Sequence, residues 1–199
     1  EEEEEEEEEV ISRAYFKLRE SMERFHIKLP SNLRAVDVGA SPGGMTQFFS
    51  ALIEKNNPGI NCEVVEHKEN PYQVSKAQLD KGIVFAIDPA ALRIDPKNVL
   101  HLQLKAEQAL DHIKQYAPYD IIVCDINALP FHAINIFQPF VPYLKEGGYL
   151  VWTIKRYWTC VHMEAVEKEF LERFPNTFKS VQIKWLLANK NERMLCAQK

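Results

Sequence analysis

The chain has 199 residues and is 46% hydrophobic, which suits one hydrophobic core in a single domain. It has no apolar run of membrane-spanning length and no signal peptide at its start, so we expect a cytoplasmic protein without a membrane partner. The four cysteines are widely spaced and form no Cys-x-x-Cys pair, which argues against a zinc site or a disulfide framework.

The net charge of −5 is dominated by the first nine residues, which are all glutamate. Such a run is typical of a self-repelling tail or an artefact, so we expect the folded part to be a single domain over residues 10–199. Without the nine glutamates, 20 acidic residues face 24 Lys and Arg, a net charge of +4. This mild basicity permits a nucleic-acid partner without demanding one.

From residue 10 onward, helical and strand patterns alternate along the chain. Apolar residues at helical spacing predict helices over residues 11–25, 44–55, 106–116, 134–144 and 161–174. Short apolar runs predict strands over residues 35–38, 82–87, 99–104, 120–124, 149–154, 181–187 and 193–197. The pattern is weaker from 60 to 81, where residues 62–65 suit a short strand and residues 73–79 a turn or two of helix.

This alternation predicts an α/β fold with a mostly parallel sheet and helices on both faces. The last two strands have no helix between them, so they must pair antiparallel. A Rossmann-like sheet with an antiparallel last strand is the common architecture of S-adenosylmethionine-dependent methyltransferases.

The most informative segment covers residues 35–47, Ala-Val-Asp-Val-Gly-Ala-Ser-Pro-Gly-Gly-Met-Thr-Gln. A strand, an acidic residue, a small-residue turn and a helix start would present backbone N–H groups to a small polar ligand. The spacing fits neither the dinucleotide fingerprint nor a Walker loop. It looks like the cofactor loop of an S-adenosylmethionine-dependent methyltransferase, although a plain glycine turn is the alternative. The predicted cofactor-binding residues here are Asp37, Gly39, Ala40, Ser41, Pro42, Gly43 and Gly44.

Further polar residues stand where predicted strands end, and the carboxyl ends of parallel strands share one edge of a sheet. Asp125 and Lys155 follow two such strands, and Glu192 begins the antiparallel last strand, which places it on the same edge. Asp88 also follows a strand, where it could bind a cofactor ribose or simply cap a turn before a proline; Glu66 is its rival for the ribose.

Several segments carry a resemblance to one family. Ser-Arg-Ala-Tyr-Phe-Lys-Leu at 12–18, the glycine loop, Cys-Asp at 124–125, Thr-Ile-Lys at 153–155 and Asn-Glu-Arg at 191–193 occur in this order. The chain resembles the FtsJ-like (RrmJ-like and RlmM-type) RNA ribose 2′-O-methyltransferases over nearly everything from residue 12 to 199. The resemblance implies that the cofactor is S-adenosylmethionine and that the partner is RNA, with ribosomal RNA as the leading candidate. It also implies a catalytic tetrad of Lys17, Asp125, Lys155 and Glu192. Asp125 also counts among the cofactor-binding residues.

The sequence departs from this family at two places. After Asp125 it reads Ile-Asn-Ala-Leu-Pro, where members often have Met-Ala-Pro. Residues 102–105 lack the acidic residue that many members place near the adenine, and Glu107 follows two residues later. Which residue contacts the adenine is therefore open.

The tetrad suits methyl transfer to a hydroxyl, with Lys155 as general base or as the group that orients the hydroxyl. A free lysine has a pKa of about 10.4 and is not a base at neutral pH. Burial and the like charge of Lys17 would lower the pKa of Lys155, while Asp125 and Glu192 would oppose part of that shift. Read singly, each residue could equally be an ordinary ion pair or a solvated lysine.

For RNA, basic side chains could hold phosphates and aromatic ones could stack on bases. The candidates are Arg13, Lys17, Arg19, Lys28, Arg156, Lys190, Arg193, Tyr15, Tyr157 and Trp158. Alternatives to ribosomal RNA are tRNA, an mRNA cap or a protein as methyl acceptor, or a non-catalytic methyltransferase-like module that binds RNA or protein. The six histidines show no metal-ligand spacing and methyl transfer needs no metal, so none is predicted. A monomer is expected.

Overall fold

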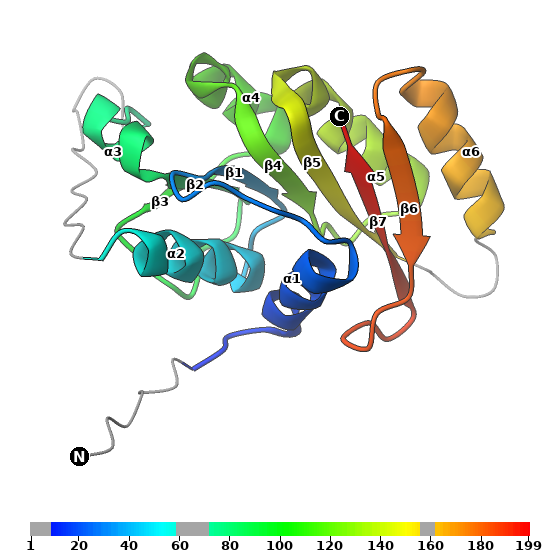
Figure 1. Cartoon of the computed structure of the whole chain (residues 1–199), viewed down its shortest axis with the longest axis horizontal. Helices are drawn as coiled ribbons and strands as arrows, with labels where there is room; N and C mark the ends of the chain where they lie inside the picture. The colour runs from blue at the N-terminus through cyan, green and yellow to red at the C-terminus, as the bar shows by residue number, and fades with distance from the viewer. Residues whose placement is uncertain (1–8, 59–71, 156–161) are drawn as a thin grey trace.

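The computed structural model describes residues 9–58, 72–155 and 162–199. Within these residues one seven-stranded sheet has the order β3-β2-β1-β4-β5-β7-β6 (Figure 1). The strands are β1 (Arg34–Val38), β2 (Ile83–Ile87), β3 (Val99–Leu102), β4 (Tyr119–Cys124), β5 (Leu144–Lys155), β6 (Ser180–Lys184) and β7 (Glu192–Gln198). The first five pair in parallel, and β7 runs antiparallel to both β5 and β6. The predicted α/β architecture is confirmed.

Helices cover both faces of this sheet (Figure 1). The helices are α1 (Arg13–Arg24), α2 (Gly44–Asn56), α3 (Lys76–Lys81), α4 (Ala106–Ile113), α5 (Pro130–Phe137) and α6 (Met163–Arg173), with short 3₁₀ helices at Lys114–Tyr116 and Gln138–Tyr143. Helices α1 and α2 share one hydrophobic cluster, while α4, α5 and α6 contribute to a second one on the opposite face. Among the described residues, none of these helices has the length and apolarity to cross a bilayer.

Both faces of the central strands are buried, so β2 is apolar throughout and β4 is apolar apart from Asp120. Every residue of β2 and β4 is buried. Along β4, Ile121 and Val123 pack toward α1 and α2, whereas Ile122 and Cys124 pack toward the other helices. The continuous apolar runs in the sequence therefore identified these strands correctly.

Several boundaries differ from the sequence prediction. Helix α5 begins at Pro130 rather than at residue 134, because proline suits the first turn of a helix, and the predicted helix to residue 144 is completed by a 3₁₀ segment. The predicted helix over 106–116 likewise ends as a 3₁₀ turn. Strand β5 starts at Leu144, five residues before the prediction, because Gly147 and Gly148, where the sequence predicts a turn, continue the strand.

Two further differences lie near the ends of elements. Helix α3 starts at Lys76 instead of residue 73, because Ser75 caps it by accepting the N–H of Gln78 at 3.2 Å. Strand β6 ends at Lys184, so residues 185–187 belong to the β6–β7 loop. Strand β3 ends at Leu102. The predicted strand over 62–65 lies outside the described residues.

Candidate active site

The glycine loop after β1 is a tight turn packed against the start of the β4–α5 connection. Gly39 has φ +82°, and a Cβ at this position would lie 2.3 Å from Ile126 Cγ2 and 3.1 Å from the Ile126 Cα. The N–H groups of Gly39 and Ala40 both donate to the carbonyl of Ile87, at 2.9 and 3.2 Å. Only glycine fits at position 39, because the backbone conformation is left-handed and the space is filled.

These bonds correct one expectation about the loop. The sequence predicted that its backbone N–H groups face a ligand, yet Gly39 and Ala40 are bonded to β2, and Ser41 N–H donates to Asp88 Oδ2 at 3.1 Å. Their amides anchor the loop to the neighbouring strand. Their contribution to binding is therefore shape: Gly39, Ala40, Ser41 and Pro42 line a cavity of about 220 Å³.

Asp37, at the end of β1, lies in the wall of this cavity and is 1% exposed. Its Oδ2 accepts the Thr46 hydroxyl at 2.7 Å, while among the described residues its Oδ1 has no hydrogen-bond partner. Burial raises the pKa of Asp37 to about 7, the Thr46 hydrogen bond opposes the rise, and the charges of Asp125 and Asp88 add to it. An unpartnered buried carboxylate oxygen in a cavity wall is complementary to a ligand cation.

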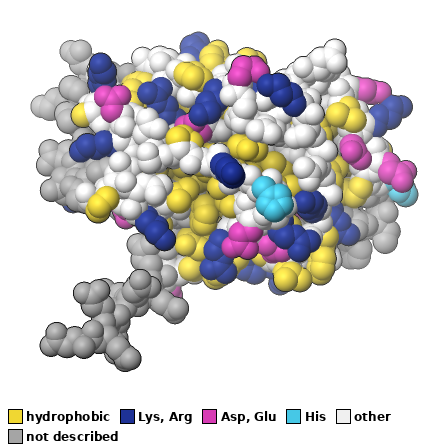
Figure 2. Space-filling view, in the orientation of Figure 1, with side chains coloured by type: hydrophobic (Ala, Val, Ile, Leu, Met, Phe, Trp, Pro, Cys, Tyr) yellow, Lys and Arg dark blue, Asp and Glu magenta, His cyan; other side chains and the backbone are white. Residues whose placement is uncertain are grey.

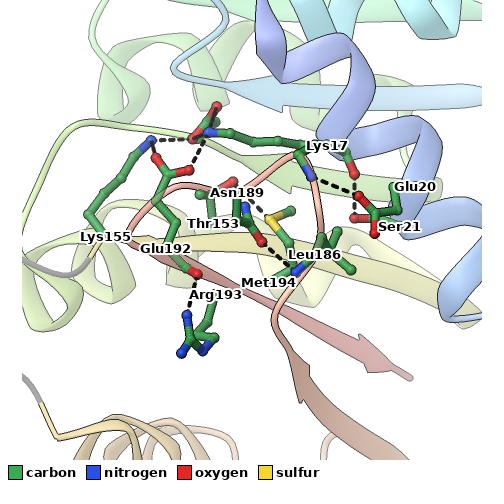
Figure 3. A network of polar contacts seen from close by, with 12 residues as sticks. Lys17, Glu20, Ser21, Thr153, Lys155, Leu186, Asn189, Glu192, Arg193 and Met194 are labelled. Atoms are coloured by element: carbon green, nitrogen blue, oxygen red, sulfur yellow. Dashed lines mark hydrogen bonds and ion pairs between the residues drawn. The ribbon is translucent and has the colours of Figure 1, made fainter.

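The four residues of the predicted tetrad form one connected cluster at the carboxyl edge of the sheet, and Figure 3 shows Lys17, Lys155 and Glu192 converging there. Lys17 Nζ, from α1, lies 3.3 Å from Asp125 Oδ2 and 2.9 Å from Glu192 Oε2. Lys155 Nζ, from the end of β5, lies 2.5 Å from Asp125 Oδ1 and 3.0 Å from Glu192 Oε1. Each lysine thus bridges both carboxylates. Two positive and two negative charges balance, which limits the cost of removing them from water.

The electrostatics of Lys155 differ from the expectation. Burial lowers the pKa of Lys155, but the charge and hydrogen bond of Asp125, with those of Glu192, outweigh burial and leave this pKa raised. The prediction that the carboxylates oppose only part of the shift is wrong, because both lie within 3.0 Å of Nζ. For Glu192, burial raises the pKa, and the bonds from Lys17 and Lys155 outweigh it and lower the pKa.

Asp88 sits at the end of β2 in a half-buried position and performs the turn role that the sequence offered as an alternative. Its Oδ1 accepts the N–H of Ala90 at 2.8 Å, and its Oδ2 accepts the N–H of Ser41. It also lines a second cavity of about 340 Å³. Each carboxylate oxygen keeps a second lone pair, so a ribose contact stays a prediction. Its rival Glu66 lies outside the described residues.

The second cavity meets the first one at Gly39, which lines both. Its far wall contains Leu104, Lys105 and Glu107, the stretch in which the sequence left the adenine contact open, and His132 from α5. A larger cavity of about 470 Å³ lies between α2 and residues 94–97, but it contains no member of the tetrad.

Sequence reasoning missed Ser12 as a site residue. Ser12 lines the first cavity, and its buried hydroxyl has no hydrogen-bond partner among the described residues. Ser12 stands at the N-cap position of α1, yet its side chain makes no capping bond. The only signal was its place in the Ser-Arg-Ala segment, and a serine before a helix is ordinarily read as a cap.

The side chains predicted to contact RNA differ in how exposed they are to solvent. Arg13, Arg19, Lys28 and Lys190 are exposed, as a phosphate-binding residue must be. Lys17 is buried in the tetrad, which corrects its assignment as a phosphate contact. Arg193 and Tyr15 are half-buried, and Tyr15 packs edge-on against Phe16 and Phe48. Arg156, Tyr157 and Trp158 lie outside the described residues.

The fold and the site together define a class. A sheet in which only β7 runs against the rest, a glycine loop after β1 and polar residues gathered at the carboxyl edge are those of an S-adenosylmethionine-dependent methyltransferase fold. Consistent with this, the sequence model of the FtsJ-like methyltransferases matches residues 10–185. The chain belongs to the FtsJ-like methyltransferase family.

Individual proteins are similar to this chain in sequence or in fold. An uncharacterized protein of Methanocaldococcus jannaschii is 27% identical over 192 residues, 95% of this chain, which spans 47% of that relative's length. Ribosomal RNA large subunit methyltransferase E of Rickettsia peacockii is 26% identical over 182 residues, 86% of this chain and 70% of its own. Aeropyrum pernix fibrillarin, solved with natively bound S-adenosyl-L-methionine, superposes with a TM-score of 0.57 at 18% identity, covering 93% of this chain and 76% of its own.

Proposed function

We propose that this chain transfers a methyl group from S-adenosylmethionine to a ribose 2′-hydroxyl of RNA, with ribosomal RNA as the substrate. The observation that carries the proposal is the Lys17–Asp125–Lys155–Glu192 cluster, beside two cavities that meet at the glycine loop. The ribosomal substrate is supported by the name of the Rickettsia relative.

The cofactor would supply an electrophilic methyl group on a positively charged sulfonium. The residues present fit such a ligand, because Asp37 and Ser12 line the first cavity and each has a buried side-chain oxygen without a hydrogen-bond partner among the described residues. A carboxylate there is complementary to an amino-acid ammonium group. We assign to the cofactor the predicted residues that line the first cavity, with Ser12 added and Asp88 from the second cavity: Ser12, Asp37, Gly39, Ala40, Ser41, Pro42, Asp125 and Asp88. The predicted Gly43 and Gly44 line neither cavity and would shape the loop instead.

Lys155 is the tetrad member we assign to the substrate hydroxyl. Its side chain is 15% exposed, whereas that of Lys17 is 5% exposed, so Lys155 is the more accessible of the two lysines. Its raised pKa keeps the ammonium form at neutral pH, in which Nζ donates a hydrogen bond to the hydroxyl oxygen. This favours the orienting role, which aligns a lone pair for attack, over the general-base role, and the hydroxyl proton then leaves to solvent as the O–CH₃ bond forms. Lys17, Asp125 and Glu192 hold Nζ in place.

The RNA strand would approach over α1 and the β6–β7 loop. Arg13, Arg19 and Lys190 are exposed here, and Figure 2 shows Lys and Arg side chains along the lower rim of the molecule, with acidic and apolar side chains between them. Phe16 is 37% exposed with the Arg19 guanidinium 5.0 Å from its ring centre, and Leu187 is 79% exposed. Cationic groups beside apolar ones suit a single strand whose phosphates are held and whose bases are packed.

The test is transfer of labelled methyl from S-adenosylmethionine to unmethylated ribosomal RNA, followed by alkaline hydrolysis. A 2′-O-methyl blocks cleavage at its linkage, so label in alkali-resistant dinucleotides is expected. Label in mononucleotides would move the methyl group to a base. Transfer only to tRNA, cap or protein would change the substrate, and absent cofactor binding would leave a non-catalytic module.

A further inference from the structure

The loop between β6 and β7 leads directly into Glu192, and one carboxylate of α1 holds it. Glu20 Oε1 accepts the N–H of Leu187 at 2.9 Å, and Oε2 accepts the N–H of Ala188 at 2.9 Å. In the close view Glu20 projects from α1 toward the loop (Figure 3). A carboxylate that accepts one N–H on each oxygen fixes both distance and orientation, and hydrogen bonds to charged acceptors are the stronger ones.

Hydrogen bonds within the β6–β7 loop hold it in one conformation. Leu186 N–H donates to Asn189 Oδ1 at 3.0 Å, and Asn189 N–H donates to the Leu186 carbonyl at 3.0 Å. The Leu186 side chain is fully buried in the cluster that α1 and α2 share. At the start of the loop, Lys184 Nζ donates to the Arg24 carbonyl at 2.7 Å. The β5–β7 pairing places Glu192 opposite Lys155, and the contacts of this internally bonded loop with α1 add a second attachment just before Glu192, which links α1 to the start of β7.

The same turn of α1 carries a tetrad member. Lys17 precedes Glu20 by three residues, so the two side chains are neighbours along the helix surface. Lys17 contacts Glu192 Oε2 at 2.9 Å, and Glu20 holds the loop that precedes Glu192. One helical turn is therefore tied to the β6–β7 segment twice, once through the tetrad and once through Glu20.

We propose that Glu20 is a positioning residue, which sets the contact of Glu192 with Lys17 and Lys155 by fastening the β6–β7 loop to α1. This inference rests on the proposed function for its catalytic consequence, since it assigns Glu20 a role in the same reaction. Glu20 acts through Glu192 and touches no reacting atom. A contact that only stabilised the fold would change the unfolding temperature without changing the tetrad.

The kinetic test compares Glu20→Ala, which removes both acceptors, with Glu20→Gln, which keeps one, and with Glu23→Ala, an exposed glutamate of the same helix, as control. A misplacement of about 1 Å in a catalytic group costs up to about 100-fold in rate. We expect kcat to fall about 10- to 100-fold in Glu20→Ala and less in Glu20→Gln, with the Kd for S-adenosylmethionine within about twofold. Glu23→Ala should match the wild type.

A double mutant shows whether the effect passes through Glu192. If it does, adding Glu20→Ala to Glu192→Gln should cause no further loss of kcat, whereas independent effects would multiply. Unchanged kcat in Glu20→Ala, or multiplied losses in the double mutant, would overturn the proposal.

A measurement without substrate separates this proposal from the proposed function. Lys17 and Lys155 outweigh burial and hold the pKa of Glu192 below its ordinary value, so the pKa followed by carboxyl NMR should rise in Glu20→Ala. Hydrogen exchange at Leu187 and Ala188 should accelerate at the same time. If the wild type methylates no RNA, the proposed function fails, while these readouts still decide the position of Glu192. An unchanged Glu192 titration refutes the role of Glu20.

Discussion

Asp37→Asn should make the protein more stable at alkaline pH while weakening its cofactor binding. Burial raises the pKa of Asp37 from an ordinary 3.8 to about 7. The charges of Asp125 and Asp88 add to this rise, and the hydrogen bond from Thr46 opposes it. Each pKa unit corresponds to about 1.36 kcal/mol, so holding Asp37 ionised in the folded state costs about 4 kcal/mol at pH 8. Asparagine removes this cost and can still accept the Thr46 hydroxyl.

The raised pKa of Asp37 also fixes how the stability gain of Asp37→Asn changes with pH. Between pH 4 and 7 the folded protein holds a proton on Asp37 that the unfolded chain has released, so this group's contribution to stability falls as pH rises. The gain from Asp37→Asn should therefore be negligible near pH 4, grow through this window and level off above pH 7. Urea denaturation at four pH values measures it, with the exposed Asp80→Asn as control. A gain independent of pH, or destabilisation at pH 8, would refute the reasoning.

The same variant removes the carboxylate that we assign to the cofactor's ammonium group. A hydrogen bond to a charged group contributes about 1.5–3 kcal/mol, so the Kd for S-adenosylmethionine should rise about 10- to 150-fold at pH 8. Calorimetric titration measures this change. An unaltered Kd would place the cofactor's amino group elsewhere in the cavity.

Three other substitutions test separate parts of the site. Gly39→Ala should destabilise the protein by about 1–3 kcal/mol in urea denaturation and weaken cofactor binding, because it strains a left-handed backbone and meets Ile126; wild-type behaviour would contradict the tight turn. Lys17→Met should cost about 3 kcal/mol of stability by leaving two carboxylates with one lysine, and a smaller loss than in the exposed Lys114→Met would contradict a buried tetrad. Leu187→Ala should raise the KM for RNA about threefold or more without changing the melting temperature; an unchanged KM would remove this loop from the RNA path.

The sequence predicted the fold well where strands are buried on both faces. The apolar runs of β2 and β4 could be recognised without ambiguity, and the order of strands and helices implied the sheet. The same topology brought Asp125, Lys155 and Glu192 to one edge, although they are far apart in the chain. The β5 start was missed because Gly147 and Gly148 ordinarily signal a turn.

Distances and side-chain directions could not be predicted in this way. The raised pKa of Lys155 depends on two carboxylates lying within 3.0 Å of Nζ, against the effect of burial, and no spacing in the sequence fixes that balance. Ser12 was missed because its place in the cavity wall follows from the fold and not from its neighbours in the sequence. Glu20 carries no distinguishing signal in the sequence, because its role depends on the β6–β7 loop that lies beside it in the fold.

The most direct test of the central claim is the single-turnover rate of methyl transfer by Lys155→Ala at saturating cofactor and RNA. Lys145→Ala is the matched control, because Lys145 lies on the same strand and is paired with Asp120 outside the tetrad. We expect Lys155→Ala to lower the rate by about 100-fold or more with an unchanged Kd for S-adenosylmethionine, and Lys145→Ala to leave the rate within about twofold of the wild type. A Lys155→Ala rate equal to that of the control would contradict the assignment of this lysine to the reacting hydroxyl.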